Sequence, residues 1–170
     1  LRADPGKAQA LRAKYQKAAN GKKLAGLSWH SSAEQFGSEK SVPPVLLAPL
    51  FERADVFWVN LQHGAAAGDI ASDVLLRDSD IDALVDMDGF AAQIAAIDFV
   101  VSVSNTTAHV AGALGKPVQI MLPKVKNRHW YWFPARAPNP WYPSLRPYVQ
   151  SVDGEWRDVV AAVNEDLATA

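Results

Sequence analysis

The feature that most constrains the fold is a repeated alternation of short apolar segments with segments of helical character. The apolar segments are nearly continuous runs at residues 24–29, 56–61, 99–103 and 118–122. Strands that are buried on both faces have this pattern, and buried strands separated by helices form a parallel sheet. The alternation therefore predicts a Rossmann-like, three-layer α/β/α domain with a parallel sheet at its centre.

The segments around these strands carry signals for helix starts and stops. Asp4 suits a helix N-cap and Pro5 the first helical position. Helices are predicted over residues 4–19, 43–51, 90–97, 107–114 and 153–167. Residues 117–147 hold seven of the eleven prolines, so few regular elements are expected there. With 170 residues, of which 49% are hydrophobic, residues 1–170 are predicted to form one domain.

Composition excludes several function classes. Lys plus Arg number 17 and Asp plus Glu number 18, so the net charge of −1 gives no general reason to expect nucleic acid as a partner. The absence of cysteine excludes disulfides, thiolate nucleophiles and zinc-thiolate sites. No apolar run approaches the roughly 18 residues that a membrane span needs, so we expect no span and a cytoplasmic location. The start lacks an initiator Met and a signal-peptide core, and we expect the chain to continue a longer protein.

The most informative stretch is the turn that follows the predicted strand at 99–103. Small hydroxyl and amide side chains come next, and then an Ala-rich helix that stops at Gly115 and Pro117. Helix N-termini bind anions, because their first N–H groups lack acceptors and the helix dipole adds about half a positive charge. A plain helix cap is the alternative for such a turn taken alone. Its place at a strand's carboxyl end favours a diphosphate site formed by Ser104, Asn105, Thr106, Thr107 and His109.

A specific motif extends through this turn, since residues 105–117 read N-T-T-x-H-x-A-G-A-L-G-x-P. Less specific segments accompany it at residues 26–30, 40–43, 61–64, 97–103 and 141–144. In this order the segments resemble the C-terminal domain of bacterial tetratricopeptide-repeat glycosyltransferases, which are related to glycosyltransferase family 9, the heptosyltransferases. The resemblance covers residues 4–150, most of the chain.

The resemblance implies a GT-B fold in which this domain binds a nucleotide sugar. A separate N-terminal acceptor or tetratricopeptide-repeat domain would bind the acceptor, a protein or glycan. It also implies that Lys40 neutralises the donor phosphates and that residues 105–109 form the phosphate turn. Heptosyltransferases commonly have Asp-Thr-Gly where this chain has Ser-Asn-Thr at 104–106, which leaves the sugar open. The N-T-T run is similar to the phosphate turn of O-linked N-acetylglucosamine transferases, which favours a UDP-sugar. No metal and no further cofactor is implied.

The loop after the first predicted strand should overhang the same sheet edge as the phosphate turn. It would bring His30, Ser31, Ser32 and Lys40 to the donor. A lysine in such a loop is usually solvated, so replacing Lys40 should change stability little. Gln62 ends the second strand, where it either reads a nucleobase or makes only turn contacts.

Two further clusters have simpler interpretations. Acidic residues crowd positions 69–88, and their spacing predicts a solvated acidic face rather than a metal site. A basic aromatic cluster predicts a flap on the domain or a loop at an interdomain cleft, rather than a nucleic-acid surface. Its members are Lys124, Lys126, Arg128, His129, Trp130, Tyr131, Trp132 and Arg136.

The sequence is compatible with two functions for this domain. The leading one is a glycosyltransferase donor-binding domain, which holds a nucleotide-diphosphate sugar for transfer to a hydroxyl acceptor. The general base is not identified, because relatives supply it from the other domain. The alternative is a catalytically inactive GT-B-like binding or assembly module, since a fold does not guarantee a function.

Overall fold

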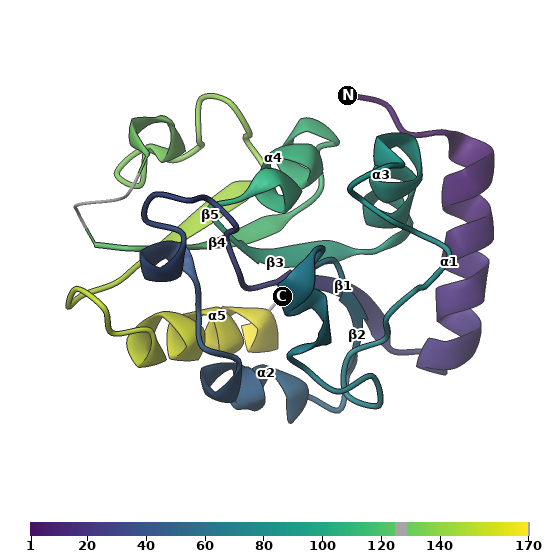
Figure 1. Cartoon of the computed structure of the whole chain (residues 1–170), viewed down its shortest axis with the longest axis horizontal. Helices are drawn as coiled ribbons and strands as arrows, with labels where there is room; N and C mark the ends of the chain where they lie inside the picture. The colour runs from purple at the N-terminus through teal and green to yellow at the C-terminus, as the bar shows by residue number, and fades with distance from the viewer. Residues whose placement is uncertain (125–128, 170) are drawn as a thin grey trace.

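The computed structural model describes residues 1–124 and 129–169 and places five parallel strands in one sheet (Figure 1). They are β1 (Lys23–Ser28), β2 (Val56–Asn60), β3 (Phe99–Val103), β4 (Val118–Leu122) and β5 (Leu145–Val149). Their order across the sheet is β2-β1-β3-β4-β5, and all neighbours are parallel. The prediction that the four apolar segments form one parallel sheet is therefore confirmed.

Helices cover both faces of the sheet and give the domain three layers (Figure 1). One face carries α1 (Pro5–Ala19), α3 (Met87–Ala96) and α4 (Thr106–Ala113), and the other carries α2 (Ala48–Phe51) and α5 (Arg157–Thr169). Alternate residues of a strand supply the two cores, as in any pleated strand. In β3, Val100 packs in the core beneath α3 and α4, whereas Val101 and Val103 pack in the core beneath α2 and α5.

Two helices differ from their predicted bounds by more than three residues or by an interruption, and α3 begins three residues early, at Met87. The helix expected over residues 43–51 is divided into a 3₁₀ helix, Pro44–Leu47, and the separate α2. Pro49 has no N–H to bond back to the carbonyl four residues earlier, so a continuous α-helix is interrupted there. The closing helix begins at Arg157 rather than at 153, because Gly154, with φ 82°, first turns the chain.

A fifth strand was not predicted, because β5 begins in the proline-rich region 117–147 and contains Pro147. The expectation of irregular structure is wrong for this element. β5 lies at the edge of the sheet and pairs only with β4. An edge strand tolerates a residue without an N–H, since one side of its backbone has no partner strand.

Helix α1 is tied to the domain by two carboxylates. The guanidinium of Arg12 lies 2.7 Å from Asp98 Oδ1. The hydroxyl of Tyr15 donates to Asp78 Oδ2 at 2.7 Å, and Lys14 Nζ lies 2.7 Å from Asp78 Oδ1. Asp78 is only 7% exposed, so the prediction of a solvated acidic face is wrong for this residue. Its partners on α1 supply the hydrogen bonds that a buried carboxylate requires.

Candidate functional site

The strand order creates a topological switch point between β1 and β3, because the chain passes from β1 out to β2 and then returns to β3. The register pairs Ser28 with Ser102, so the carboxyl ends of both strands are level. Ligands of open α/β sheets bind where the loops diverge at such a point. A cavity of about 340 Å³ lies there, and we name it the switch-point pocket. Its lining residues are His30, Ser31, Ser32, Ala33, Lys40, His63, Ser104, Asn105, Thr106, His109, His129 and Tyr131.

Asn105 caps α4 and joins the ends of two strands. Its Oδ1 accepts from the backbone N–H of Ala108 at 3.4 Å and from the hydroxyl of Ser102 at 3.0 Å. Its Nδ2 donates to Ser28 Oγ at 2.8 Å and to the carbonyl of His30 at 3.1 Å. The side chain of Asn105 therefore fixes the geometry of the pocket through four protein contacts.

The other polar residues of the turn differ in what they offer a ligand. Thr106 is exposed and lines the switch-point pocket. Thr107 is fully buried, and its hydroxyl is directed to the carbonyl of Leu61 at 3.5 Å. Ser104 is 5% exposed and accepts from the indole N–H of Trp132 at 2.8 Å. The turn therefore offers an anion the hydroxyls of Thr106 and Ser104 and the N–H groups of the first helical turn other than that of Ala108.

Lys40 lies at the end of a 3₁₀ helix, Ser38–Lys40, in the loop that follows β1. The residue is only 4% exposed, so the alternative of an ordinary solvated lysine does not hold. Its Nζ lies 3.4 Å from Nε2 of His129. Within residues 1–124 and 129–169, no carboxylate forms an ion pair with Lys40. Burial, with a smaller effect of the Lys40 ammonium, lowers the pKa of His129.

His109 is held between aromatic side chains. Its ring stacks on that of Trp132 with centroids 4.5 Å apart, and its Nδ1 lies 3.0 Å from the hydroxyl oxygen of Tyr142. Tyr142 packs against Gly112, where a Cβ atom would come 2.5 Å from the tyrosine Cγ. The glycine of the A-G-A run thus allows Tyr142 to reach His109. Burial, and to a lesser extent His129, lower the pKa of His109, which favours the neutral imidazole.

The loop after β1 is ordered by its own hydrogen bonds. Ser41 Oγ donates to the carbonyl of Gly37 at 2.7 Å and accepts from the backbone N–H of Ser31 at 3.0 Å. The same oxygen lies 3.1 Å from Nδ1 of His30. These contacts hold His30 and Ser31 at the switch-point pocket, where the sequence analysis expected them.

Two of the predicted site residues, Gln62 and the buried Thr107, do not line the switch-point pocket. Gln62 Oε1 accepts from Ser28 Oγ at 2.9 Å and from the backbone N–H groups of Trp29 and His30 at 3.1 and 2.9 Å. Its Nε2 donates to the carbonyl of His63 at 3.1 Å. The amide of Gln62 thus makes the turn contacts that were one of its two interpretations.

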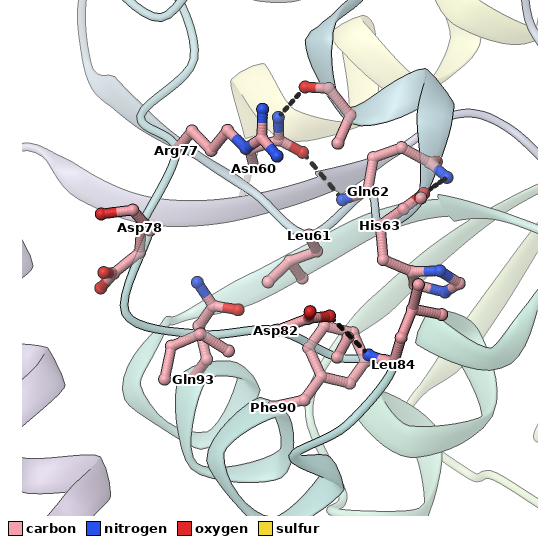
Figure 2. A pocket seen from close by; sticks show the side chains of 15 residues that line it. Asn60, Leu61, Gln62, His63, Arg77, Asp78, Asp82, Leu84, Phe90 and Gln93 are labelled. Carbon is pink, nitrogen blue, oxygen red and sulfur yellow. Dashed lines mark hydrogen bonds between the residues drawn. The ribbon is translucent and has the colours of Figure 1, made fainter.

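A second cavity, of about 320 Å³, lies beside the first, and we name it the β2 pocket. Figure 2 shows its walls, formed by the end of β2, the segment at 77–84 and α3. It is lined by Asn60, Leu61, Gln62, His63, Gly64, Ala67, Arg77, Asp78, Ser79, Ile81, Asp82, Ala83, Leu84, Phe90 and Gln93. His63 lines both cavities, so they are adjacent.

Part of the switch-point pocket was not predicted from the sequence. His129 and Tyr131 were expected in a flap on the domain or in a loop at an interdomain cleft, and neither His63 nor Tyr142 was singled out. His129 is 89 positions from Lys40 in the chain, so no local pattern connects them. Lys126 and Arg128 of the predicted basic aromatic cluster lie outside the described residues. The W-Y-P-S motif at 141–144 was the only sequence signal for Tyr142.

In residues 1–124 and 129–169, no group of three or more His, Asp or Glu side chains is placed to hold a metal ion. No helix within the same ranges is long and apolar enough to cross a bilayer.

Solved structures of glycosyltransferases resemble this chain across most of its length. E. coli ADP-heptose LPS heptosyltransferase II matches with a TM-score of 0.66 and 17% identity, over 99% of this chain and 52% of that one. A family 9 glycosyltransferase from Veillonella parvula matches with a TM-score of 0.59 and 14% identity, over 100% of this chain and 51% of that one. E. coli heptosyltransferase WaaC with ADP gives a TM-score of 0.57 at 13% identity, over 88% and 44%.

The fold is that of one half of a GT-B glycosyltransferase. Among curated proteins, Protein FlbA of Caulobacter vibrioides is 33% identical over 175 residues, which are 96% of this chain and 28% of that protein. No protein-family model matches the chain. The chain thus spans about half the length of the solved glycosyltransferases and less than a third of FlbA.

Proposed function

We propose that the switch-point pocket binds the diphosphate of a nucleotide sugar, so that this domain presents the sugar for transfer to a hydroxyl acceptor. The observation that carries the proposal is Lys40, which is 4% exposed and has no carboxylate partner within the described ranges. A buried charge is costly unless a counter-charge is present. A diphosphate would supply that counter-charge.

The hydrogen-bond donors around Lys40 suit a diphosphate, which is the leaving group when a sugar is transferred from a nucleotide sugar. Negative charge develops on the diphosphate as the sugar C1–O bond breaks, and prearranged donors that stabilise this charge accelerate the reaction. The N–H groups at the start of α4 and the hydroxyl of Thr106 lie at the same pocket as Lys40. His109 and His129 add ring nitrogens, and an arriving anion would raise the pKa of both rings.

The β2 pocket is the proposed position of the nucleoside. It adjoins the switch-point pocket at His63, and it combines the apolar ring of Phe90 with the amide of Gln93 (Figure 2). Such a mixture of apolar walls and a few polar groups is usual for small-molecule sites. A UDP-sugar remains the preferred donor for the test, on the basis of the N-T-T turn.

The acceptor side of the reaction is proposed to lie outside this domain. The solved glycosyltransferases are about twice as long as this chain. We propose that an N-terminal acceptor domain, with or without tetratricopeptide repeats, binds a protein or glycan hydroxyl. That domain would also supply the general base that deprotonates the acceptor.

Calorimetric titration tests the proposal with UDP, GDP, ADP and CMP and with their sugar conjugates. We expect one class of nucleotide to bind and Lys40→Met to weaken this binding by roughly 1–3 kcal/mol, the range for a lost charged hydrogen bond. The loss should shrink as salt is added, because salt screens the attraction in the unmodified chain. Lys17→Met, which removes the same charge from an exposed position on α1, is the control.

Two results would contradict the proposal. One is that no nucleotide binds to the unmodified chain. The other is equal binding by the Lys40→Met and Lys17→Met variants. Binding without glycosyl transfer by the longer protein would instead support the binding-module alternative.

A further inference from the structure

Two histidines of the switch-point pocket have one ring nitrogen fixed by a hydroxyl, and the first of them is His30. Ser41 Oγ has one hydrogen, which it donates to the carbonyl of Gly37 at 2.7 Å. At its 3.1 Å contact with Nδ1 of His30, Ser41 must therefore accept, so Nδ1 carries a hydrogen. A neutral imidazole has only one N–H. Nε2 of neutral His30 is thus a hydrogen-bond acceptor on a side chain that lines the pocket.

In the second histidine, His109, the hydrogen is on the other ring nitrogen, Nε2. Its Nδ1 lies 3.0 Å from the hydroxyl oxygen of Tyr142. A phenol is a better donor than acceptor, because its lone pair is partly delocalised into the ring, whereas an unprotonated imidazole nitrogen accepts strongly. The tyrosine hydroxyl therefore donates to Nδ1, and Nε2 of neutral His109 carries the hydrogen. Within residues 1–124 and 129–169, the hydrogen bond of the His109 ring is the one at Nδ1, so Nε2 is free to donate to a ligand.

The groups around each ring are compatible with these tautomers. The ring of Tyr131 lies 5.4 Å from that of His109, and His129 is the nearby titratable group. The Lys40 ammonium lies beside His129, which is itself near His109. A positive charge in this position attracts the same anion to which Nε2–H of His109 would donate. The backbone carbonyl of His30 is held by Nδ2 of Asn105, at 3.1 Å, which fixes the position of the acceptor histidine.

We propose that the switch-point pocket recognises its ligand through this pair of tautomers, with Nε2–H of His109 donating to a phosphate oxygen and Nε2 of His30 accepting from a sugar hydroxyl. The inference rests on the proposed function. Phosphate oxygens at neutral pH lack hydrogens to donate, so the lone pair of His30 selects a hydroxyl-bearing group beside the diphosphate. Ser41 and Tyr142 are then positioning residues, which act by fixing the two tautomers.

Long-range ¹H–¹⁵N correlation spectra of the full chain at about pH 8, where an unperturbed histidine is neutral, report both tautomers directly. We expect Nδ1–H for His30 and Nε2–H for His109. Ser41→Ala should convert only His30, and Tyr142→Phe only His109, into a mixture of tautomers. Tyr131→Phe is the matched control, because this ring neighbours His109 but its hydroxyl does not contact either histidine.

Binding measurements separate the two contacts by comparing a nucleoside diphosphate with its sugar conjugate. Tyr142→Phe should weaken both ligands about fivefold, which corresponds to one ordinary hydrogen bond. Ser41→Ala should weaken the sugar conjugate by a similar factor, and it should weaken the nucleoside diphosphate clearly less. This difference between the ligands is not expected from a merely loosened loop, which would weaken both equally.

The outcomes distinguish this inference from the proposed function. Reversed tautomers in the unmodified chain, a doubly protonated His30 at that pH, or equal weakening of both ligands by Ser41→Ala would overturn the inference while nucleotide binding persists. Expected tautomers without any nucleotide binding would overturn the proposed function and the ligand assignment with it. If a variant fails to fold, the spectrum of the unmodified chain decides the tautomers.

Discussion

At the scale of single residues, the switch-point pocket depends on side chains that are expensive to bury. Lys40 is nearly inaccessible, and the group beside its ammonium is the imidazole of His129. Proteins retain such residues for binding more readily than for stability, because a buried charge with no counter-charge opposes folding. Lys40 is therefore expected to strengthen the binding of an anionic ligand while it lowers the free energy of unfolding of the unliganded domain.

Lys40→Met tests this expectation, since methionine fills a similar volume without a charge. We expect the free energy of unfolding, measured by chemical denaturation, to stay the same or rise by up to about 1 kcal/mol, because desolvation of the ammonium is relieved. The same variant should bind nucleotide more weakly. A clear loss of stability would show that Lys40 supports the fold instead.

Thr106 provides a second prediction at this scale. Thr106→Val replaces the exposed hydroxyl by a methyl group beside the first N–H groups of α4. We expect nucleoside-diphosphate binding to weaken by roughly 1–3 kcal/mol in calorimetry, because a donor to a charged group is lost and branched bulk is added. Thr169→Val, on an exposed position of α5, makes the same change away from the pocket. Equal affinities of the two variants would remove Thr106 from the site.

At the scale of elements, α4 is placed by the segment that crosses over it. Asn139 is buried and accepts through Oδ1 from the backbone N–H groups of Trp141 and Tyr142 at 2.9 and 3.0 Å. Its Nδ2 donates to the carbonyl of Trp132 at 2.7 Å. This asparagine thus holds the two aromatic side chains that enclose His109, so the proline-rich segment positions the pocket.

Gly112→Ala tests the packing between α4 and this segment. The new Cβ would come 2.5 Å from Cγ of Tyr142, so the ring or the helix must move. We expect a loss of about 1–3 kcal/mol in the free energy of unfolding, the usual range for overpacking. Gly68→Ala is the control, because its Cβ meets no atom within 4 Å. Equal stability of both variants would show that Tyr142 moves aside freely.

At the scale of the whole molecule, acidic residues on the body of the domain hold α1 in place. Burial raises the pKa of Asp78, but hydrogen bonds from Lys14, Tyr15 and the backbone N–H of Asp80 outweigh it and lower that pKa overall. Burial also raises the pKa of Asp98, and the backbone N–H of Leu24 together with Arg12 likewise lower it overall. Both carboxylates are therefore bound in their charged forms.

The sign of this shift predicts the response to acid. A carboxylate whose folded-state pKa is depressed contributes stability above its unfolded pKa of about 3.9, and this contribution is lost as the pH falls through the folded-state pKa. We expect the free energy of unfolding to fall steeply below about pH 4. Asp78→Asn should reduce this slope, whereas Asp80→Asn, at an exposed carboxylate, should not. Identical slopes would contradict the assignment to Asp78.

Four of the five strands and the turn before α4 could be predicted from the sequence alone. Nearly continuous apolar runs such as 99–103 and 118–122 are buried on both faces, and this pattern is local, so it identifies them as strands of a parallel sheet. The turn at Asn105 was also readable, because small polar residues between a buried strand and an Ala-rich helix leave few alternatives.

The groups that meet at the switch-point pocket could not be predicted from the sequence, because long-range packing brings them together. Lys40 and His129 come from segments 89 positions apart, and the burial of the lysine depends on both. Gln62 has the polarity of a ligand group, yet its amide is bonded to the end of β1. Strand β5 was not recognised in the sequence because it contains Pro147, and a proline is tolerated in a strand at the edge of a sheet. Local propensity fixes elements, whereas burial and hydrogen-bond partners are set by segments distant in the chain.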